Sequence, residues 1–276
     1  MSSSVGLRNV INPIDPFSPF KSAPGFFNIA HRGASYYAPE NTMASFQLAL
    51  EMNADMIELD VTLSRDNIPV VFHDRTLSRT TGGKGNIRKY LLRELHELDA
   101  GSWFSESHKN LRIPTLEEVL IWSSGKIALN IEIKKEAVDG NHTFGIVELI
   151  SKMVSDFKMT DQVVISSFSK EALARSRNVA PGISTAHLVN PYSWGTTRAL
   201  HLMKRLGATG LNIKPRQMKP KLMDMAILEN IPVWVYTVDD EDEMKTVIKK
   251  GATGIFTNKP DRLAEVAAIT LGGHAD

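Results

Sequence analysis

The segment MIELDVTL, residues 56–63, alternates apolar and polar residues, a pattern typical of a β-strand with two different faces. Successive side chains of a strand point to opposite sides, so Glu58, Asp60 and Thr62 share one face and the apolar residues between them share the other. Acidic side chains rarely lie in a buried strand unless a counter-charge or a metal ion compensates them. The segment therefore predicts a strand whose acidic face has a function.

The segment LNIEIK, residues 129–134, has the same alternation, with Glu132 and Lys134 on one face. If both polar faces point into a barrel, Glu58, Asp60 and Glu132 meet near its C-terminal mouth. Three carboxylates so close would repel one another and raise their pKa values, and a divalent cation would remove that conflict. Ligation by oxygen alone indicates Mg²⁺, Ca²⁺ or Mn²⁺. The alternative is that each strand simply has one solvated face.

Two histidines follow predicted strands. His31 comes directly after the run at residues 25–30, and His73 ends the extended run at residues 70–73. Both would lie at the C-terminal face of a barrel, where such folds keep their active sites. A histidine titrates near neutral pH, so the two form a candidate general acid/base pair. Taken singly, each would more often be a structural or surface residue.

Arg32 and Lys134 are the cationic candidates for binding phosphate. Arginine presents a planar fork to phosphate oxygens, and lysine presents a compact point charge. The alternatives are a salt bridge from Arg32 to Glu40 or Asp74, and a solvated Lys134 at the end of its strand.

The rest of the chain alternates short β-branched runs with segments of helical periodicity. Strands are expected at residues 25–30, 56–63, 127–134, 163–168, 183–189, 210–213, 232–238 and 254–257. Helices are expected from residue 115 and near residues 41–52, 143–158, 170–179, 196–206, 219–230, 240–250 and 260–270. Eight strand–helix units in about 250 residues predict an α/β fold, the (β/α)₈ TIM barrel. The alternative is an open doubly wound sheet, but no G-x-G-x-x-G turn follows the first strand.

Capping signals mark the starts of two of these helices. Either Asn41 or Thr42 can cap the first helix. The segment TLEE, residues 115–118, has the pattern of a capping box. Both signals indicate where a loop gives way to a helix.

A single catalytic barrel domain is expected over residues 26–272, after a Pro- and Phe-rich N-terminal arm over residues 1–25. The strand–helix rhythm breaks at about residues 75–114, which contain a glycine-rich turn. This break predicts a small insertion after the second strand, over one mouth of the barrel.

Composition excludes several classes of protein. The 276 residues carry a net charge of +1, so no broad basic field exists to attract nucleic acid. The chain has no cysteine, which excludes disulfides, thiolate catalysis and thiolate metal sites. No signal peptide or apolar stretch of about 18 residues is found, so we expect a cytoplasmic protein without stable membrane insertion. The oligomeric state has no signature in the sequence.

An ordered set of motifs resembles the glycerophosphodiester phosphodiesterase family. The matching segments are HRG at 31–33, PENT at 39–42, ELDV at 58–61, VVFHD at 70–74, IPTLEE at 113–118, EIK at 132–134 and SSF at 166–168. The resemblance implies a TIM barrel that hydrolyses glycerophosphodiesters to sn-glycerol 3-phosphate and an alcohol, with a divalent metal. It implies the following roles: His31 and His73 as the acid/base pair, Glu58, Asp60 and Glu132 as metal ligands, and Arg32 and Lys134 as phosphate contacts.

The chain departs from the family pattern near its C-terminal end. The family's W-T-V-N is YTVD here, residues 236–239, and its T-D-x-P is TNKP, residues 257–260. We expect Trp234, Tyr236 and Phe168 to form a wall of the substrate pocket. The departures bear on specificity for the alcohol more than on the chemistry.

The sequence is also compatible with three alternative functions. One is a lysophospholipase D-type activity on lysophospholipids, with Trp103, Phe104, Trp194 and the Phe-rich arm lining an acyl-chain groove. Another is a non-catalytic barrel that binds phosphodiesters. The third is an isomerase or aldolase that uses Lys134 as a Schiff base.

Overall fold

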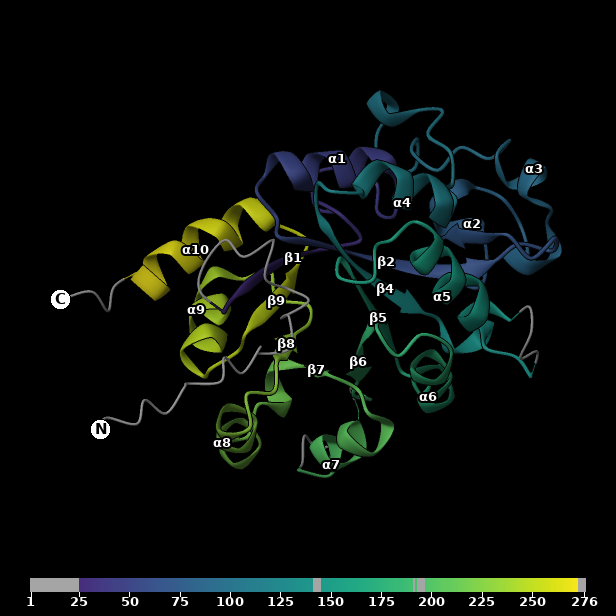
Figure 1. Ribbon diagram of the computed structural model, residues 1–276. Coiled ribbons are helices and arrows are strands. Elements are labelled where there is room, and N and C mark those ends of the chain that lie inside the picture. Colours follow the sequence, from purple (N-terminus) through teal and green to yellow (C-terminus); the bar gives the residue numbers. More distant parts are fainter. Residues whose placement is uncertain (1–24, 141–144, 191, 193–196, 273–276) are drawn as a thin grey trace, which may run out of the picture.

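The structure, a computed structural model, describes residues 25–140, 145–190, 192 and 197–272. In this part of the chain, eight parallel strands follow one another around a barrel, which closes because β1 pairs with both β9 and β2. The barrel strands are β1 (Phe27–His31), β2 (Met56–Leu63), β4 (Ala128–Ile133), β5 (Val163–Ser167), β6 (Ser184–Leu188), β7 (Gly210–Ile213), β8 (Val233–Val235) and β9 (Gly254–Thr257) (Figure 1). The predicted (β/α)₈ TIM barrel is thus confirmed.

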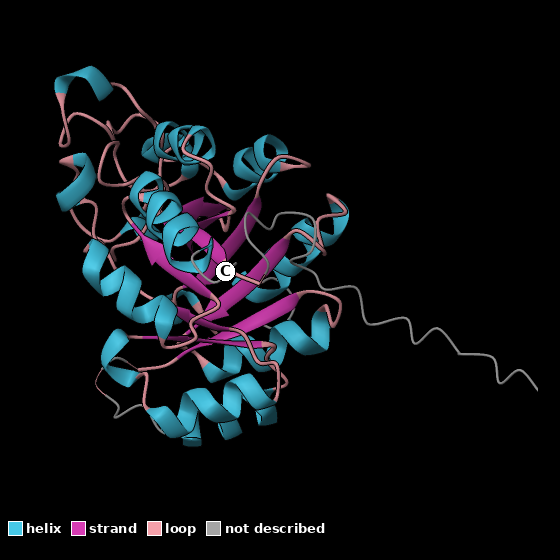
Figure 2. Ribbon diagram, turned by 90° about the vertical axis from the view of Figure 1, so that its left-hand side faces the viewer, coloured by secondary structure: helices cyan, strands magenta, loops and turns pink. Residues whose placement is uncertain are grey.

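Helices surround the strands on the outside of the barrel (Figure 2). The main ones are α1 (Met43–Glu51), α4 (Leu116–Ser123), α5 (Ile146–Asp156), α6 (Lys170–Val179), α7 (Thr197–Leu206), α8 (Pro220–Leu228), α9 (Glu241–Lys249) and α10 (Pro260–Gly272). Two short 3₁₀ helices follow barrel strands, η4 (Lys135–Ala137) and η5 (Pro215–Gln217). Apolar residues of β2 that point outward, such as Ile57, Leu59 and Val61, are fully buried in a cluster with residues of these helices. This packing leaves the other face of β2 to the barrel interior.

The neighbouring residues Asn41 and Thr42 have different roles at the start of α1. Thr42, and not Asn41, caps α1, because its side chain accepts the backbone N–H of Ser45. Thr115 and Glu118 form the predicted capping box of α4. Asn41 has a left-handed φ of 57°, and its side-chain amide donates to Asp60 on β2.

The segment after β2 forms a layer at one end of the barrel. Strand β3 (Pro69–Val71) turns back antiparallel to β2. Short helices follow, α2 (Ser78–Thr81), η2 (Ile87–Lys89), α3 (Leu92–Leu95) and η3 (Glu106–His108), on the right of Figure 1. Residues of η2, α3 and the connecting loops share a small apolar cluster with β3, composed of Val70, Phe72, Leu77, Ile87, Leu95, Ala100 and Ile113. This cluster gives residues 75–114 a core of their own.

The division into an arm, one barrel domain and an insertion stays a prediction. Residues 1–24 of the expected arm lie outside the described residues.

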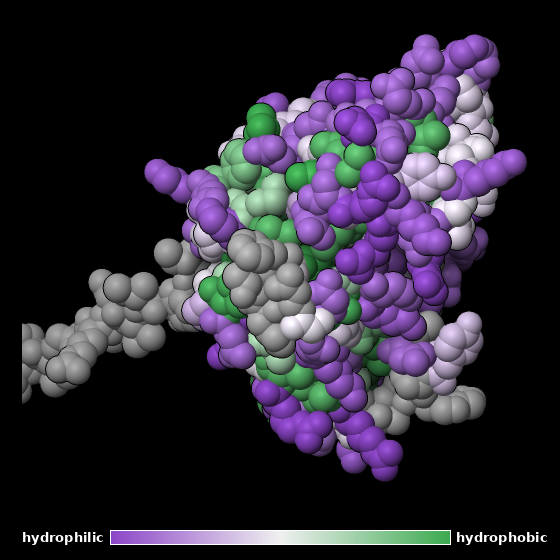
Figure 3. Space-filling view, turned by 90° about the vertical axis from the view of Figure 1, so that its right-hand side faces the viewer, coloured by the Kyte–Doolittle hydropathy of each residue, from purple (hydrophilic) through white to green (hydrophobic). Residues whose placement is uncertain are grey.

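Within the described ranges, no helix combines the length and the apolar character needed to cross a membrane. The face on the side of the insertion carries mainly hydrophilic side chains, with apolar ones visible between them (Figure 3).

Candidate active site

Three carboxylates meet where β2 and β4 run side by side. The two strands pair in parallel, with Asp60 opposite Glu132. Oxygen atoms of Glu58, Asp60 and Glu132 lie within 4.8 Å of one another. Glu58 and Asp60 are only 3% and 1% exposed. The alternation of polar residues along both strands thus places three acids inside the barrel, as the sequence predicted.

Two cations and an amide compensate Asp60. Lys134 Nζ lies 3.2 Å from its Oδ1, and Arg32 Nε lies 3.2 Å from its Oδ2. The side-chain amide of Asn41 donates a hydrogen bond of 2.9 Å to Oδ2. Burial alone would raise the pKa of Asp60, but Lys134 and Arg32 hold that pKa well below its usual range. Asp60 is therefore an anion in the folded protein.

The other two acids are less well compensated. Burial, with repulsion from Asp60, raises the pKa of Glu132 to about 7, although Lys134 Nζ lies 3.0 Å from its Oε1. Burial, then Asp60 and Glu132, raise the pKa of Glu58 well above its usual value. A divalent cation would supply the positive charge that these acids lack. The donor set, three carboxylates and no thiolate, fits Mg²⁺, Ca²⁺ or Mn²⁺.

The turn after β1 aims Arg32 at the acids. Arg32 has a left-handed φ of 58° and donates its backbone N–H to Glu58 Oε2 at 3.0 Å. Its guanidinium also pairs with Glu40 at 2.9 Å, one of the salt bridges considered from the sequence. The next residue, Gly33, packs so tightly that an added Cβ would lie 2.5 Å from Ser45 Oγ. Glycine is therefore required here, by both this contact and its φ of 84°.

His31, at the end of β1, presents its two ring nitrogens to different partners. Nδ1 lies 2.8 Å from Asn258 Oδ1, and Nε2 lies 4.0 Å from Glu58 Oε2. Burial, and next the charge of Arg32, lower the pKa of His31 to about 4. The imidazole is therefore neutral near pH 7.

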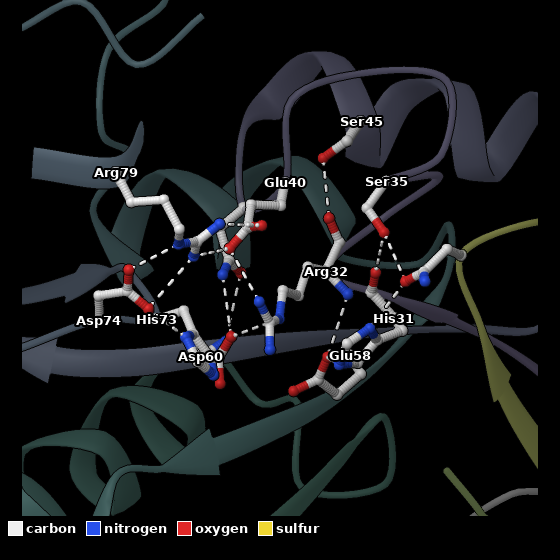
Figure 4. A network of polar contacts seen from close by, with 12 residues as sticks. His31, Arg32, Ser35, Glu40, Ser45, Glu58, Asp60, His73, Asp74 and Arg79 are labelled. Atoms are coloured by element: carbon white, nitrogen blue, oxygen red, sulfur yellow. Dashed lines mark hydrogen bonds and ion pairs between the residues drawn. The ribbon is translucent and has the colours of Figure 1, made fainter. Parts of the chain in front are cut away.

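His73 lies on the insertion side of the site. Its Nδ1 is 2.5 Å from Asp74 Oδ1. Arg79, on α2, forms two salt bridges. Its Nε lies 2.6 Å from Asp74 Oδ2, and its Nη2 lies 2.7 Å from Glu40 Oε1. Figure 4 shows the carboxylates of Asp60 and Glu58 between the Asp74–Arg79 pair on one side and His31 on the other. The two histidines thus approach the acids from different elements.

A cavity of about 1420 Å³ opens at this mouth of the barrel. Its lining includes His73, Glu132 and Lys134 from the site. The basic side chains Arg75, Arg88, Lys135, Lys170 and Arg198 also line it. A cavity with this many cations suits an anionic substrate.

The predicted aromatic wall is only partly at the mouth. Phe168 lines the cavity. The ring of Tyr236 packs edge-on against the ring of Phe168, with the two centroids 6.3 Å apart. Trp234 lies two residues earlier on β8, one layer deeper in the barrel, because each strand residue advances about 3.3 Å. It is 2% exposed and lines a separate cavity of about 390 Å³ with Gly25 and Phe27. Trp234 is therefore not placed in the wall of the mouth.

Sequence reasoning did not single out Asn41, Arg79 and Asn258 as residues of the site. Asn41 has a plausible second reading as a helix cap, and Arg79 belongs to a segment without regular periodicity. Asn258 follows β9, and β9 pairs with β1. Two signals were available: Asn41 and Asn258 lie in the motifs PENT and TNKP, and each strand end of a parallel barrel lies at the same face.

Comparison with known proteins agrees with this geometry. The model of the glycerophosphoryl diester phosphodiesterase family matches residues 31–262. The chain belongs to this family. The predicted enzyme class, a glycerophosphodiester phosphodiesterase, is thereby confirmed.

Individual members of the family are similar over nearly their whole length. A glycerophosphodiester phosphodiesterase of Caldanaerobacter subterraneus is 37% identical, covering 89% of this chain and 98% of the relative. One from Bacillus subtilis is 33% identical, covering 95% and 94%. An Oleispira antarctica phosphodiesterase, solved in complex with the product sn-glycerol-3-phosphate, has a TM-score of 0.78 and 32% identity, covering 86% of this chain and 95% of that one.

Proposed function

We propose that the protein hydrolyses glycerophosphodiesters to sn-glycerol 3-phosphate and an alcohol, with one divalent metal ion. The observation that carries the proposal is the cluster of Glu58, Asp60 and Glu132 flanked by two histidines and two cations. The Oleispira relative, with sn-glycerol-3-phosphate bound, supports this product. A glycerophosphodiester is an anion, which suits the basic cavity.

Arg32 and Lys134 bind the phosphate in this proposal. Both already contact Asp60 and so stand at the edge of the acidic cluster. A divalent ion held by Glu58, Asp60 and Glu132 would supply Lewis-acid stabilisation of a phosphate oxygen. The two side-chain cations neutralise the charge that grows on the other oxygens in the transition state.

His31 and His73 move the protons. One removes a proton from the attacking hydroxyl, and the other protonates the leaving alkoxide. Asp74 orients His73 through its bond to Nδ1. The attacking group is either water or the glycerol 2-hydroxyl of the substrate itself. Detection of a cyclic phosphate by phosphorus NMR during turnover in ¹⁸O-water would identify the second route.

The direct test measures release of glycerol 3-phosphate from several glycerophosphodiesters. Treatment with EDTA should abolish release, and Mg²⁺, Ca²⁺ or Mn²⁺ added back should restore it to different degrees. Release from none of the diesters with any of these metals would refute the proposed function.

Replacing either histidine tests the catalytic pair. We expect His31→Ala and His73→Ala each to lower kcat about 10²- to 10⁴-fold, the usual contribution of general acid–base catalysis. His201→Ala, in an exposed position on α7, serves as the matched control. Near-normal kcat in both variants would show that the histidines have been assigned wrongly.

Two of the alternative functions are less well supported. Trp103 and Phe104 pack on each other and do not line the mouth cavity, and Trp194 lies outside the described residues. Higher activity on lysophosphatidylcholine than on glycerophosphocholine would still favour a lysophospholipase D-type activity. For Lys134, burial would lower the pKa, but Asp60 and Glu132 raise it above its usual value, whereas a Schiff-base lysine needs a lowered one.

A further inference from the structure

His31 is held by residues from the far end of the chain. Asn258, which follows β9, reaches the ring of His31 on β1, and Asp239, which follows β8, holds the side-chain amide of Asn258. We propose that Asp239 and Asn258 are positioning residues that fix the tautomer of His31, so that it enters the reaction as a proton acceptor at Nε2. This inference rests on the catalytic role proposed above for His31.

Asp239 decides which way the amide of Asn258 points. An ionised carboxylate has acceptors only, so its partners must donate. It receives Asn258 Nδ2 at 2.6 Å, the backbone N–H of Asn258 at 2.7 Å and Thr257 Oγ1 at 3.0 Å. With Nδ2 committed to Asp239, the carbonyl oxygen Oδ1 must face His31.

The amide orientation in turn decides the tautomer of His31. Oδ1 can only accept, so the ring nitrogen 2.8 Å away must carry the hydrogen. That nitrogen is Nδ1, which leaves Nε2 with its lone pair on the side of Glu58. Ser35 Oγ also donates to Oδ1 at 2.8 Å, which holds the oxygen in place. A proton from the substrate can therefore enter the ring only at Nε2.

Both residues fall on the departures from the family pattern noted in the sequence. That pattern has an amide at 239 and a carboxylate at 258, and this chain has the reverse. Either order pairs one amide with one carboxylate, because each amide Nδ2 needs an acceptor. The pair is therefore a unit whose two members should be exchangeable together but not separately.

Reciprocal exchange tests this directly. The variants are Asp239→Asn, Asn258→Asp and the double variant that carries both. Asp239→Asn frees the Asn258 amide to flip and offer Nδ2 to His31, which favours the wrong tautomer. Asn258→Asp sets two carboxylates against each other. In the double variant, the carboxylate at position 258 offers an acceptor to His31, and the side-chain amide at position 239 donates to that carboxylate.

We expect each single variant to lower kcat about 10- to 100-fold, the worth of one hydrogen bond to a charged group, with KM changed less than about threefold. The double variant should recover kcat to within about fivefold of the parent. Asp240→Asn is the matched control, because Asp240 caps α9 beside Asp239 and asparagine caps equally well. Single variants with unchanged kcat, or a double variant no better than the singles, would overturn the proposal.

The tautomer can also be read in the parent protein, whether or not any variant folds. Long-range ¹H–¹⁵N correlation spectra near pH 7, with Mg²⁺ and after EDTA, should show His31 protonated at Nδ1, with the signals assigned by their loss in His31→Asn. Protonation at Nε2 would refute the inference. If the protein released no glycerol 3-phosphate but kept the Nδ1–H tautomer, the proposed function would fail and the positioning would stand.

Discussion

His187 is a buried histidine that the proposed chemistry does not use. It is the last residue but one of β6 and is 5% exposed, and its Nδ1 has no hydrogen-bond partner among the described residues. Burial, and next the charge of Lys170, lower its pKa to about 4. The folded protein thus keeps this ring neutral, while the unfolded chain protonates it below about pH 6.5.

This difference makes stability fall in mild acid. Since the unfolded state binds the extra proton, the contribution of His187 is complete above about pH 6.5 and is lost as pH falls toward 4, up to about 3 kcal/mol. We expect His187→Leu to lose less Tm than the parent between pH 7 and pH 5 in a thermal melt. His201 is exposed, so His201→Leu should lose as much Tm between pH 7 and pH 5 as the parent does. Equal slopes in all three proteins would contradict this reading.

At the scale of single residues, alternation was enough to predict the acids but not their neighbours. Glu58 and Asp60 share a face because strand geometry leaves no other choice. Asn41 could not be assigned in the same way, because a residue before a helix has a competing role as its cap. Only the contact with Asp60 shows where its amide goes.

At the scale of elements, the short helix α2 supports the site from outside the ring of barrel strands. Arg79 on α2 joins Asp74, the partner of His73, to Glu40, the partner of Arg32. The position of α2 in turn depends on the small cluster around Leu77 and Leu95. Loss of packing in this cluster should therefore reach the active site.

Leu95→Ala tests that connection. Leu95 is fully buried, so its truncation should cost about 2–5 kcal/mol. We expect faster hydrogen exchange over residues 76–113, unchanged exchange in β4 and β5, and a lower kcat. Leu228 on α8 is 83% exposed, so Leu228→Ala is the control. It should change neither the exchange over residues 76–113 nor kcat. Faster exchange throughout the barrel would mean that the insertion is not a separate unit.

Regular elements were easier to predict than irregular ones. The helix expected at residues 170–179 is α6 with the same bounds, since Ser169 caps it and its periodicity is clear. Residues 75–114 gave only the expectation of an insertion, because short helices of three or four residues have no period to detect. The depth of Trp234 was missed for another reason: strand alternation gives the face of a side chain but not its layer.

At the scale of the whole molecule, metal binding should stabilise the fold. The acids Glu58 and Glu132 repel Asp60 and each other, and a bound cation removes that cost. We expect Mg²⁺ or Ca²⁺ at 100-fold excess over its Kd to stabilise the protein by about 2.7 kcal/mol, seen as a higher Tm than in EDTA.

Glu132→Gln separates this effect from nonspecific salt stabilisation. Removing one of the crowded charges should raise the Tm in EDTA slightly and abolish most of the rise with metal. A rise as large as that of the parent would show that the ion binds elsewhere.

The barrel itself could be predicted from the sequence because eight strand–helix units repeat. The pairing across the mouth could not, since His31 and Asn258 are 227 positions apart and only closure of the barrel brings them together. That closure is the pairing of β1 with β9, the first and last strands of the described chain.

The pairing of β1 with β9 also sets when activity can begin during synthesis. A ribosome makes β1 first and β9 last, so a nascent chain can bring β2 and β4 together long before Asn258 exists. Under the proposed positioning, such a chain could hold metal while His31 still rotates without its partner. Under that positioning, full turnover is reached only when the final strand docks and Asn258 meets His31.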